Sequence, residues 1–400
     1  TDDRGNLAGL LLAQLGADVI AVEPSEGQRA RRLAPFEDDL AGLERSLVHR
    51  GYNRGKRSLV LSDSAQLDRL AAGADVVLEN DALPFDVAAM GEAHPHLVTV
   101  SITPFGETGP KADWAATDLT LSAASGTMSL TGDGDRAPLR ISVPVVWHFA
   151  ALDAACAALL ALAERHRSGR GQHASVAAQS SYISSNQFRM TYALTGDDPG
   201  QRAAGGQWMG PVLAQILNPC ADGFVAAPFL FGPIIGPYSI RLWNWVHSEG
   251  GCPDSFLEVD WIGLGLIIDD DPTAMETFNE GTRLLGEFLL TKTKAEIADA
   301  AVEHRLLATP VANTRDLLLS EHLSARGYWD DVGGQRQNGR FAVFGATPLS
   351  PLGPPPALGQ HNQEISHRQP SEGPPAASGA TDEAPLDCVK VVDVSWALAG

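Results

Sequence analysis

The sequence predicts an α/β protein with a doubly wound parallel sheet and a second, smaller α+β domain. Two observations predict this class. Over the first hundred residues, short runs of β-branched residues alternate with segments of helical spacing, which is typical of βαβ units. Near residue 205 the residue pattern changes, and glycine and proline begin to alternate with short apolar runs. A chain of 400 residues is long enough for two domains.

The expected elements follow this alternation in order. Residues 6–17 have helical spacing and lead into a strand at 18–24, which a proline ends. The alternation continues with a strand, a helix and two strands, at 58–63, 65–74, 75–80 and 97–106. These strands are nearly continuous apolar runs, as expected when helices cover both faces of a parallel sheet.

A long apolar segment at 149–165 predicts a buried core helix, because it is apolar almost all round. Charged residues at its ends make it too short to span a membrane. We expect a large Rossmann-like domain, a small domain, a return segment to the large domain, a linker, and a final strand with the sequence KVVDVSW. Their boundaries are 1–204, 205–334, 335–368, 369–385 and 386–400.

Composition excludes several classes of protein. The net charge of −20 argues against a nucleic-acid partner, because phosphate binding needs a surplus of Lys and Arg. The four cysteines have no CxxC spacing, so neither a zinc site nor a disulfide framework is indicated; they are Cys156, Cys220, Cys252 and Cys388. No HExxH pattern, signal peptide or membrane span is found. We expect a cytoplasmic protein with no metal and no membrane partner.

Eight short segments carry a more specific pattern. They are LLAQLGADVIAVEP (11–24), NRGKRSLVL (53–61), ADVVLEN (74–80), LVTVSITPFGETGP (97–110), ASGTMSLTG (124–132), SGRGQHASV (168–176), TPVANTRDLLLSEHLSARGYW (309–329) and PPPALGQHNQEI (354–365). In this order they resemble motifs of the family III CoA-transferases, which include formyl-CoA:oxalate and carnitine CoA-transferases. The α-methylacyl-CoA racemases share that fold.

The resemblance implies an activity and its partners. Family members move CoA between an acyl-CoA and a small carboxylic acid, with CoA as substrate and no permanently bound cofactor. A protein carboxylate attacks the thioester and carries the acyl group and then CoA as covalent intermediates. The fold implies an interlocked dimer of two copies, or an intrachain pseudo-dimer in a tandem protein.

Ser180 is the main departure from the family pattern. Aligned on the GRGQ segment (169–172), Ser180 takes the place of the nucleophilic aspartate. A serine ester is far less activated than an anhydride or thioester, so Ser180 would be a trap or a hydrolase-like nucleophile. No Gly-x-Ser-x-Gly elbow surrounds it. We therefore expect Ser180 to be a small buried hydroxyl that bonds to the backbone, and this copy to be catalytically impaired.

Other positions also lack the residues that the family pattern has there. Trp147 stands where the racemases have an aspartate, and Thr117 stands near their histidine, so two-base proton transfer lacks its groups. The family's CoA-pocket turn after Asn80 contains Ala82, and Ala89 replaces an arginine. Some CoA-facing positions remain. The residues expected to contact CoA are Arg31, Asn53, Lys56, Arg57, Asn80 and Phe105.

The two ends of the sequence complement each other. The final segment, PLDCVKVVDVSWALAG (385–400), resembles the opening strand of a family member, whereas the first residues open on a helix. Two interpretations are open. Either a second copy begins here, which we favour because a long linker precedes the strand, or the strand completes this copy's sheet, as in a circular permutation. For the function, the alternatives to an impaired transferase copy are a non-catalytic CoA-binding or scaffold half and, less favoured, a racemase.

Overall fold

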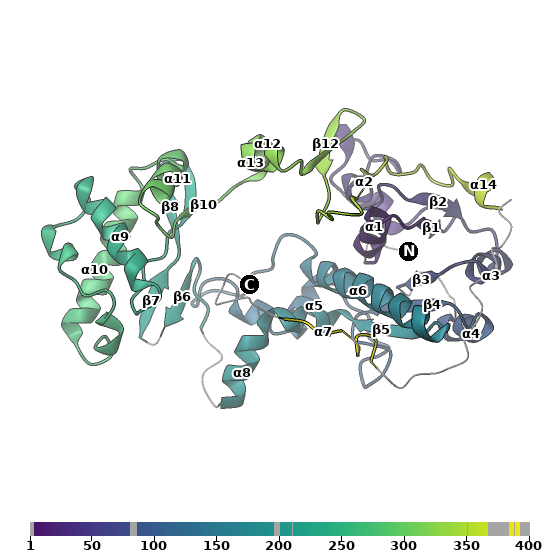
Figure 1. Ribbon diagram of the computed structural model, residues 1–400, viewed down its shortest axis with the longest axis horizontal. Helices are drawn as coiled ribbons and strands as arrows, with labels where there is room; N and C mark the ends of the chain where they lie inside the picture. Colours follow the sequence, from purple (N-terminus) through teal and green to yellow (C-terminus); the bar gives the residue numbers. More distant parts are fainter. Residues whose placement is uncertain are drawn as a thin grey trace. The chain divides into compact units, whose positions relative to one another are not determined.

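The computed structural model describes residues 4–80, 86–195, 201–209, 211–349, 351–366, 384–387 and 389–392. The chain divides into two compact units (Figure 1). Unit 1 comprises residues 1–125, 141–185 and 322–400, and unit 2 comprises residues 126–140 and 186–321. Residues 186–204 cluster with unit 2, whereas the domain boundary at 204/205 stays a prediction.

Unit 1 contains two parallel sheets in place of the single expected one. In the first, β1 (Ile20–Glu23) pairs with β2 (Arg57–Val60). In the second, β4 (Val98–Thr103) lies between β3 (Val76–Glu79) and β5 (His173–Ala177). All three pairings are parallel. Every residue of β4 is buried, which explains its continuous apolar and small-polar sequence.

Helices surround the strands of unit 1. They are α1 (Asn6–Gln14), α2 (Leu47–Tyr52), α3 (Ser64–Ala72), α4 (Val87–Ala93), α5 (Asp118–Ala124), α6 (Val145–Ser168), α7 (Ala178–Ile183) and α14 (Asn362–Ser366). Residues 322–366, which return to unit 1, add a hairpin of β11 (Trp329–Val332) and β12 (Gln335–Asn338). It ends on β2, where the His361 N–H donates to the Ser58 carbonyl at 3.1 Å.

Helix α6 is buried along one side only, which corrects the expectation of a helix buried all round. Ala150, Ala154 and Ala158 are fully buried in the core that also contains β4, whereas Leu152 and Leu159 are 45% and 43% exposed. Among the described helices, α6 alone is long and apolar enough to cross a membrane. Its packing against α1, β4, β5 and α7 is that of a core helix.

Unit 2 combines antiparallel strands with longer helices. Its strands are β6 (Gly206–Met209), β7 (Val212–Gln215), β8 (Leu217–Cys220), β9 (Gly223–Ala226) and β10 (Thr309–Pro310). They form a β6–β7 pair and a three-stranded sheet in the order β10-β9-β8. Its helices are α8 (Gln187–Thr195), α9 (Gly236–Ser248), α10 (Pro272–Leu289), α11 (Lys294–Glu303) and α12 (Thr314–Leu319); α13 (Glu321–Ala325) lies at the boundary between the units.

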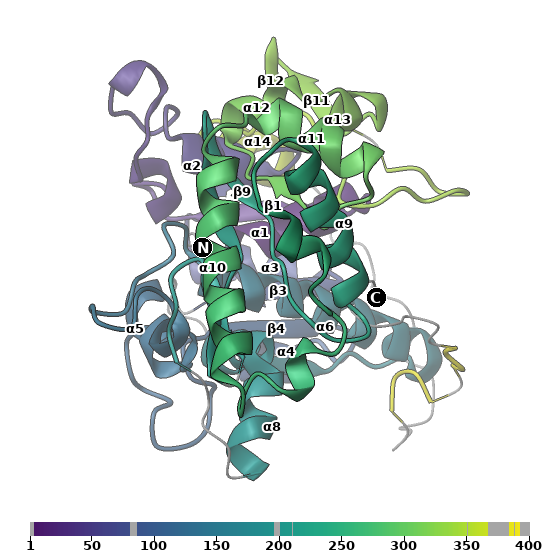
Figure 2. The ribbon, with the colours of Figure 1, turned by 90° about the vertical axis from the view of Figure 1, so that its left-hand side faces the viewer.

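Aromatic side chains form the core of unit 2. Helices α9 and α10 lie side by side (Figure 2), and Trp245 meets Phe288 edge to face at 4.9 Å between ring centroids. Phe229 contacts Trp243, Trp261 and Phe278 at 4.9–5.5 Å. These large rings bury much apolar surface in the core of this unit.

The C-terminal strand expected at 386–400 is not formed in the described residues. Residues 389–392 have irregular backbone, while Cys388 and residues 393–400 lie outside the described part, as does most of the expected linker at 369–385.

Candidate functional site

Three of the predicted site residues follow neighbouring strands of the parallel sheet. Asn80 follows β3, Phe105 lies in the loop after β4, and Ser180 lies on α7, which begins directly after β5. Because carboxyl ends of parallel strands meet at one edge, the structure brings these residues to the same edge. Ligands of open α/β sheets usually bind at that edge, so we take it as the candidate site.

The two glycines of the GRGQ segment connect α6 to β5. Gly169 ends α6 in the left-handed conformation (φ 70°), and its N–H donates to the Arg165 carbonyl at 2.7 Å. Gly171 lies so close to the β4 side of the sheet that a Cβ would stand 2.0 Å from the Leu97 carbonyl oxygen. Both positions therefore require glycine. Together they fix where β5 starts and, through β5, where Ser180 lies.

Ser180 is exposed, which corrects the expectation of a buried hydroxyl bonded to the backbone. Its neighbour Gln179 holds the turn instead. The Gln179 N–H donates to the Pro104 carbonyl at 3.0 Å, and its side-chain amide donates to the Ala124 carbonyl at 2.7 Å. Within the described part of the chain, no hydrogen bond joins the Ser180 hydroxyl to a histidine or a carboxylate. The arrangement lacks the base and orienting acid of a serine hydrolase.

Phe105 and Asn80 border the same edge. The half-buried Phe105 ring meets Trp114 edge to face, and the Lys111 ammonium lies 5.3 Å from the centroids of both rings. Asn80 is 3% exposed, and its carbonyl accepts a hydrogen bond from Arg4. Ala82, in the predicted CoA-pocket turn, lies outside the described residues.

The residues at the positions of the racemases' catalytic histidine and aspartate have structural roles in this chain. Thr117 caps α5 with its side chain. Asp118 accepts the Val146 N–H at 3.0 Å, which ties α5 to the start of α6. Trp147 is 6% exposed in the core, with the Arg4 guanidinium 5.4 Å from its ring. Ala89 is exposed on α4. None of these side chains supplies an acid–base pair for proton transfer.

Arg31 does not face the solvent. It lies in the short 3-10 helix Arg29–Arg32 and is fully buried, with its guanidinium 2.7–2.8 Å from Glu23 and 2.8 Å from Glu44. Burial alone would raise the pKa of Glu23, but hydrogen bonds from Arg31, Ser58 and the Gln28 N–H outweigh it and lower the pKa. Contact between Arg31 and the nucleotide of CoA stays a prediction that requires this ion pair to open.

The expected basic island at 53–57 is also directed inward. Lys56 is 6% exposed, and its ammonium donates to the Asn6 carbonyl at 2.8 Å and to Asn53 Oδ1 at 2.9 Å. Burial lowers the pKa of Lys56 to about 7. Arg57 is paired with Asp18 and, at 2.9 Å, with Glu364. The acidic partners that neutralise the island are distant in sequence, so the local charge pattern did not reveal them.

His49 belongs to the same buried region. It is 1% exposed, and among the described groups its Nε2 has no hydrogen-bond partner. Burial, and secondly the positive charges of Arg31 and Lys56, lower its pKa to about 4. The imidazole is therefore held in its neutral form in the folded protein.

The low pKa of His49 predicts acid sensitivity. The unfolded chain takes up a proton near pH 6.5, whereas the folded protein does so only near pH 4. Stability is therefore complete above pH 6.5 and falls by about 3 kcal/mol as the pH drops to 4. Urea unfolding across this range should show that His49→Gln removes this part of the pH dependence. The exposed His322→Gln should leave it unchanged, and equal pH slopes in all three proteins would contradict the prediction.

Sequence reasoning missed one polar arrangement. His173, at the start of β5, is 2.8 Å from Glu107 and 2.8 Å from the Thr99 hydroxyl. Burial raises the pKa of Glu107, but hydrogen bonds from Ser101, His173 and Ser175 outweigh it and lower the pKa. Glu107 thus lies ionised along one side of β4 and β5. The only sequence signal was the position of His173 directly after GRGQ.

The parallel sheets and the site at their carboxyl edge define an open α/β protein. Residues 4–233 and 260–362 match the family model described as CoA-transferase family III. The chain therefore belongs to this family.

Several named relatives cover nearly the whole chain. Succinyl-CoA:(R)-benzylsuccinate CoA-transferase subunit BbsE of Thauera aromatica is 29% identical over 91% of each chain. The "Probable CoA-transferase Rv1866" of Mycobacterium tuberculosis is 31% identical over 98% of this chain, which spans only 49% of its length. The crystal structure of a CAIB/BAIF family protein from Brucella suis has a TM-score of 0.73 at 27% identity, covering 91% of this chain and 94% of that one.

Proposed function

We propose that this chain serves in the transfer of CoA between an acyl-CoA and a small carboxylic acid. Family membership supports the reaction class. The names of four relatives pair succinyl-CoA or succinate with another acid: (R)-benzylsuccinate, glutarate, mesaconate or D-citramalate. We therefore propose succinyl-CoA as the donor class and a dicarboxylic acid as the acceptor class.

The observation that carries the proposal is the place of Ser180. The GRGQ turn, β5 and α7 present this residue in an exposed position at the carboxyl edge of the sheet. By resemblance, a carboxylate oxygen here would attack the thioester carbonyl. The C–S bond would break, CoA thiolate would leave and a mixed anhydride would form. A serine hydroxyl would instead form an ester, which CoA thiolate does not readily reverse.

We infer that this copy works beside a second copy of the fold, which supplies the carboxylate. Two features of the relatives support the pairing. Rv1866 is about twice as long as the part that this chain matches, and BbsE is named as a subunit. The second copy can thus belong to the same polypeptide or to a partner chain.

Substitution of Ser180 tests this proposal. In the protein that contains both copies, Ser180→Ala should leave CoA transfer from succinyl-CoA to a dicarboxylic acid within about twofold of the unchanged protein. The exposed Ser184→Ala on the same segment is the matched control. Loss of a catalytic group typically costs a hundredfold or more, so a drop of that size for Ser180→Ala alone would make Ser180 the nucleophile.

Mass spectrometry tests whether Ser180 forms an acyl ester. No acyl ester should accumulate on the peptide that contains Ser180 during turnover. Absence of any CoA transfer by the two-copy protein, with CoA binding retained in calorimetry, would instead favour a binding or scaffold role.

A further inference from the structure

One face of β4 carries buried hydroxyl groups in place of apolar side chains. Along this strand, apolar side chains that pack in the core with α6 alternate with Thr99, Ser101 and Thr103, which point to the opposite face. These three residues are between 1% and 5% exposed. A buried hydroxyl costs free energy unless it has a hydrogen-bond partner, so this face of the sheet needs polar groups to cover it.

The loop after β4 turns back over this face at Gly106. Gly106 has a φ of 93°, in the left-handed region that glycine adopts most easily, and its N–H donates to the Thr103 hydroxyl at 2.9 Å. The same loop contacts the start of α7, because the Pro104 carbonyl accepts the Gln179 N–H at 3.0 Å. The position of this loop therefore bears directly on where Ser180 lies.

The Glu107 carboxylate joins this loop to both strands. It accepts hydrogen bonds from the Ser101 hydroxyl of β4, the Ser175 hydroxyl of β5 and Nε2 of His173, the last at 2.8 Å. Because an ionised carboxylate only accepts, Nε2 carries the hydrogen. Nδ1 of the same imidazole lies 2.8 Å from the Thr99 hydroxyl. Glu107 thus holds the loop to two strands through three hydrogen bonds.

The geometry of this cluster indicates positioning rather than nucleophilic chemistry. Thr99, His173 and Glu107 follow the order of hydroxyl, imidazole and carboxylate that hydrolases use. Thr99, however, is 1% exposed and lies on the middle strand of the sheet, so its hydroxyl is closed to a substrate.

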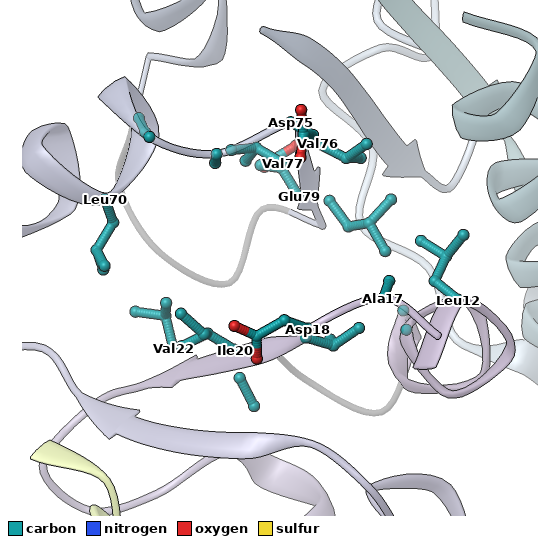
Figure 3. A pocket seen from close by; sticks show the side chains of 18 of the residues that line it. Leu12, Ala17, Asp18, Ile20, Val22, Leu70, Asp75, Val76, Val77 and Glu79 are labelled. Carbon is teal, nitrogen blue, oxygen red and sulfur yellow. The ribbon is translucent and has the colours of Figure 1, made fainter. Parts of the chain in front are cut away.

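The cluster is also separate from the cavity of unit 1. This cavity, of about 960 Å³, lies between β1 and β3, and Figure 3 shows Ile20 and Val22 facing Val77 across it. Among the described residues that line the cavity, none belongs to β5 or to the loop of residues 103–110. Changes at Glu107 therefore test the cluster independently of the cavity.

We propose that Glu107 is a positioning residue, which holds the loop of residues 103–110 on β4 and β5 and thereby sets the places of Phe105 and Ser180 at the carboxyl edge. Phe105 lies in this loop, and Ser180 follows the residue whose N–H the loop accepts. An effect on CoA follows as well, and this part rests on the proposed function, because Phe105 is an expected CoA contact.

Hydrogen exchange of two amides tests the positioning. In Glu107→Ala, the amides of Gly106 and Gln179 should exchange at least about tenfold faster than in the unchanged chain, which is the scale of a lost hydrogen bond to a charged group. The amides of Val100 and Ile102 should not change, because they face β3 on the other side of β4.

Three further variants separate the contributions. Glu107→Gln still accepts from His173 and can donate to the serine hydroxyls, so exchange at the two amides should stay within about twofold. His173→Ala removes one of the three partners and should speed exchange by about threefold, the scale of one ordinary hydrogen bond. Glu92→Ala is the matched control, since Glu92 is exposed on α4, and it should change nothing.

Three results would overturn the proposal. Faster exchange at Val100 and Ile102 as well in Glu107→Ala would mean that Glu107 only stabilises the sheet. Unchanged exchange at Gly106 and Gln179 would mean that other contacts hold the loop. Equal acceleration in Glu107→Gln and Glu107→Ala would mean that charge alone, and not the three hydrogen bonds, fixes the loop.

Calorimetry with CoA tests the functional part. The Kd of the chain for CoA should rise by about tenfold in Glu107→Ala, the scale of one lost polar or aromatic contact, and should be restored in Glu107→Gln. An unchanged Kd beside faster exchange at Gly106 and Gln179 would mean that the loop carries no CoA contact, which overturns this part. If the unchanged chain binds no CoA, the proposed function of this copy fails, and the exchange results still decide the positioning.

Discussion

Replacing Glu23 with alanine is expected to lower the free energy of unfolding of unit 1 by about 3–5 kcal/mol. Glu23 and Arg31 are both fully buried and lie 2.7 Å apart. Glu23 also accepts from the Ser58 hydroxyl at 2.6 Å and the Gln28 N–H at 3.1 Å. Its removal leaves a buried guanidinium with one remaining carboxylate, Glu44. Hydrogen exchange of the β1 and β2 amides measures the loss of unfolding free energy for unit 1 alone.

Glu44→Ala is the matched control, because Glu44 binds the same guanidinium but is 49% exposed. Exposed carboxylates contribute about 0–1 kcal/mol. The double variant Glu23→Ala/Arg31→Met should recover part of the loss, since no unpaired charge remains buried. A loss below about 1 kcal/mol for Glu23→Ala would mean that water reaches the pair.

Gly171→Ala is expected to destabilise unit 1 by about 3 kcal/mol or more, at the upper end for added atoms in a packed region. The new Cβ would meet backbone atoms of Leu97 at 2.0 and 2.3 Å. Backbone cannot rotate away as a side chain can, so the start of β5 must separate from β4. Loss of slow exchange at the amides of Thr99 and Ser101, which face β5, together with a lower melting temperature, would measure this.

Gly91→Ala tests whether the effect is specific to that close approach. Gly91 lies on α4, and a Cβ added there would have no other atom within 4 Å. Alanine there should be neutral or stabilising by up to about 1 kcal/mol. If both substitutions had the same small effect, the GRGQ segment would tolerate a side chain and its glycine would need another explanation.

Much of the fold could be predicted from short stretches of sequence. The β-branched runs at 18–24, 75–80 and 97–106 correspond to β1, β3 and β4, and the expected parallel pairing is confirmed. The family resemblance, based on motifs such as GRGQ, is confirmed as well. These features depend on residues that are neighbours in sequence, so a local pattern is enough to reveal them.

The candidate site was harder to predict. Alignment on GRGQ singled out Ser180, but the strand β5 before it was not predicted and its expected burial was wrong. The expected CoA contacts separated into two groups. Asn80 and Phe105 lie at the carboxyl edge with Ser180, whereas Arg31 and Lys56 are buried in internal polar contacts. No property of the NRGKRS motif distinguishes an inward lysine from a phosphate-binding one.

The sequence by itself determined the class of fold and its parallel strands, and it places a serine at position 180. Only the tertiary structure decided which charged groups are available to a ligand. Arg31 is also bound by the Pro356 carbonyl and Arg57 by Glu364, more than 300 residues away. The structure alone also shows the cavity between β1 and β3. The physical reason is that local spacing sets the period of helices and strands, whereas burial and pairing depend on segments that meet only in the folded chain.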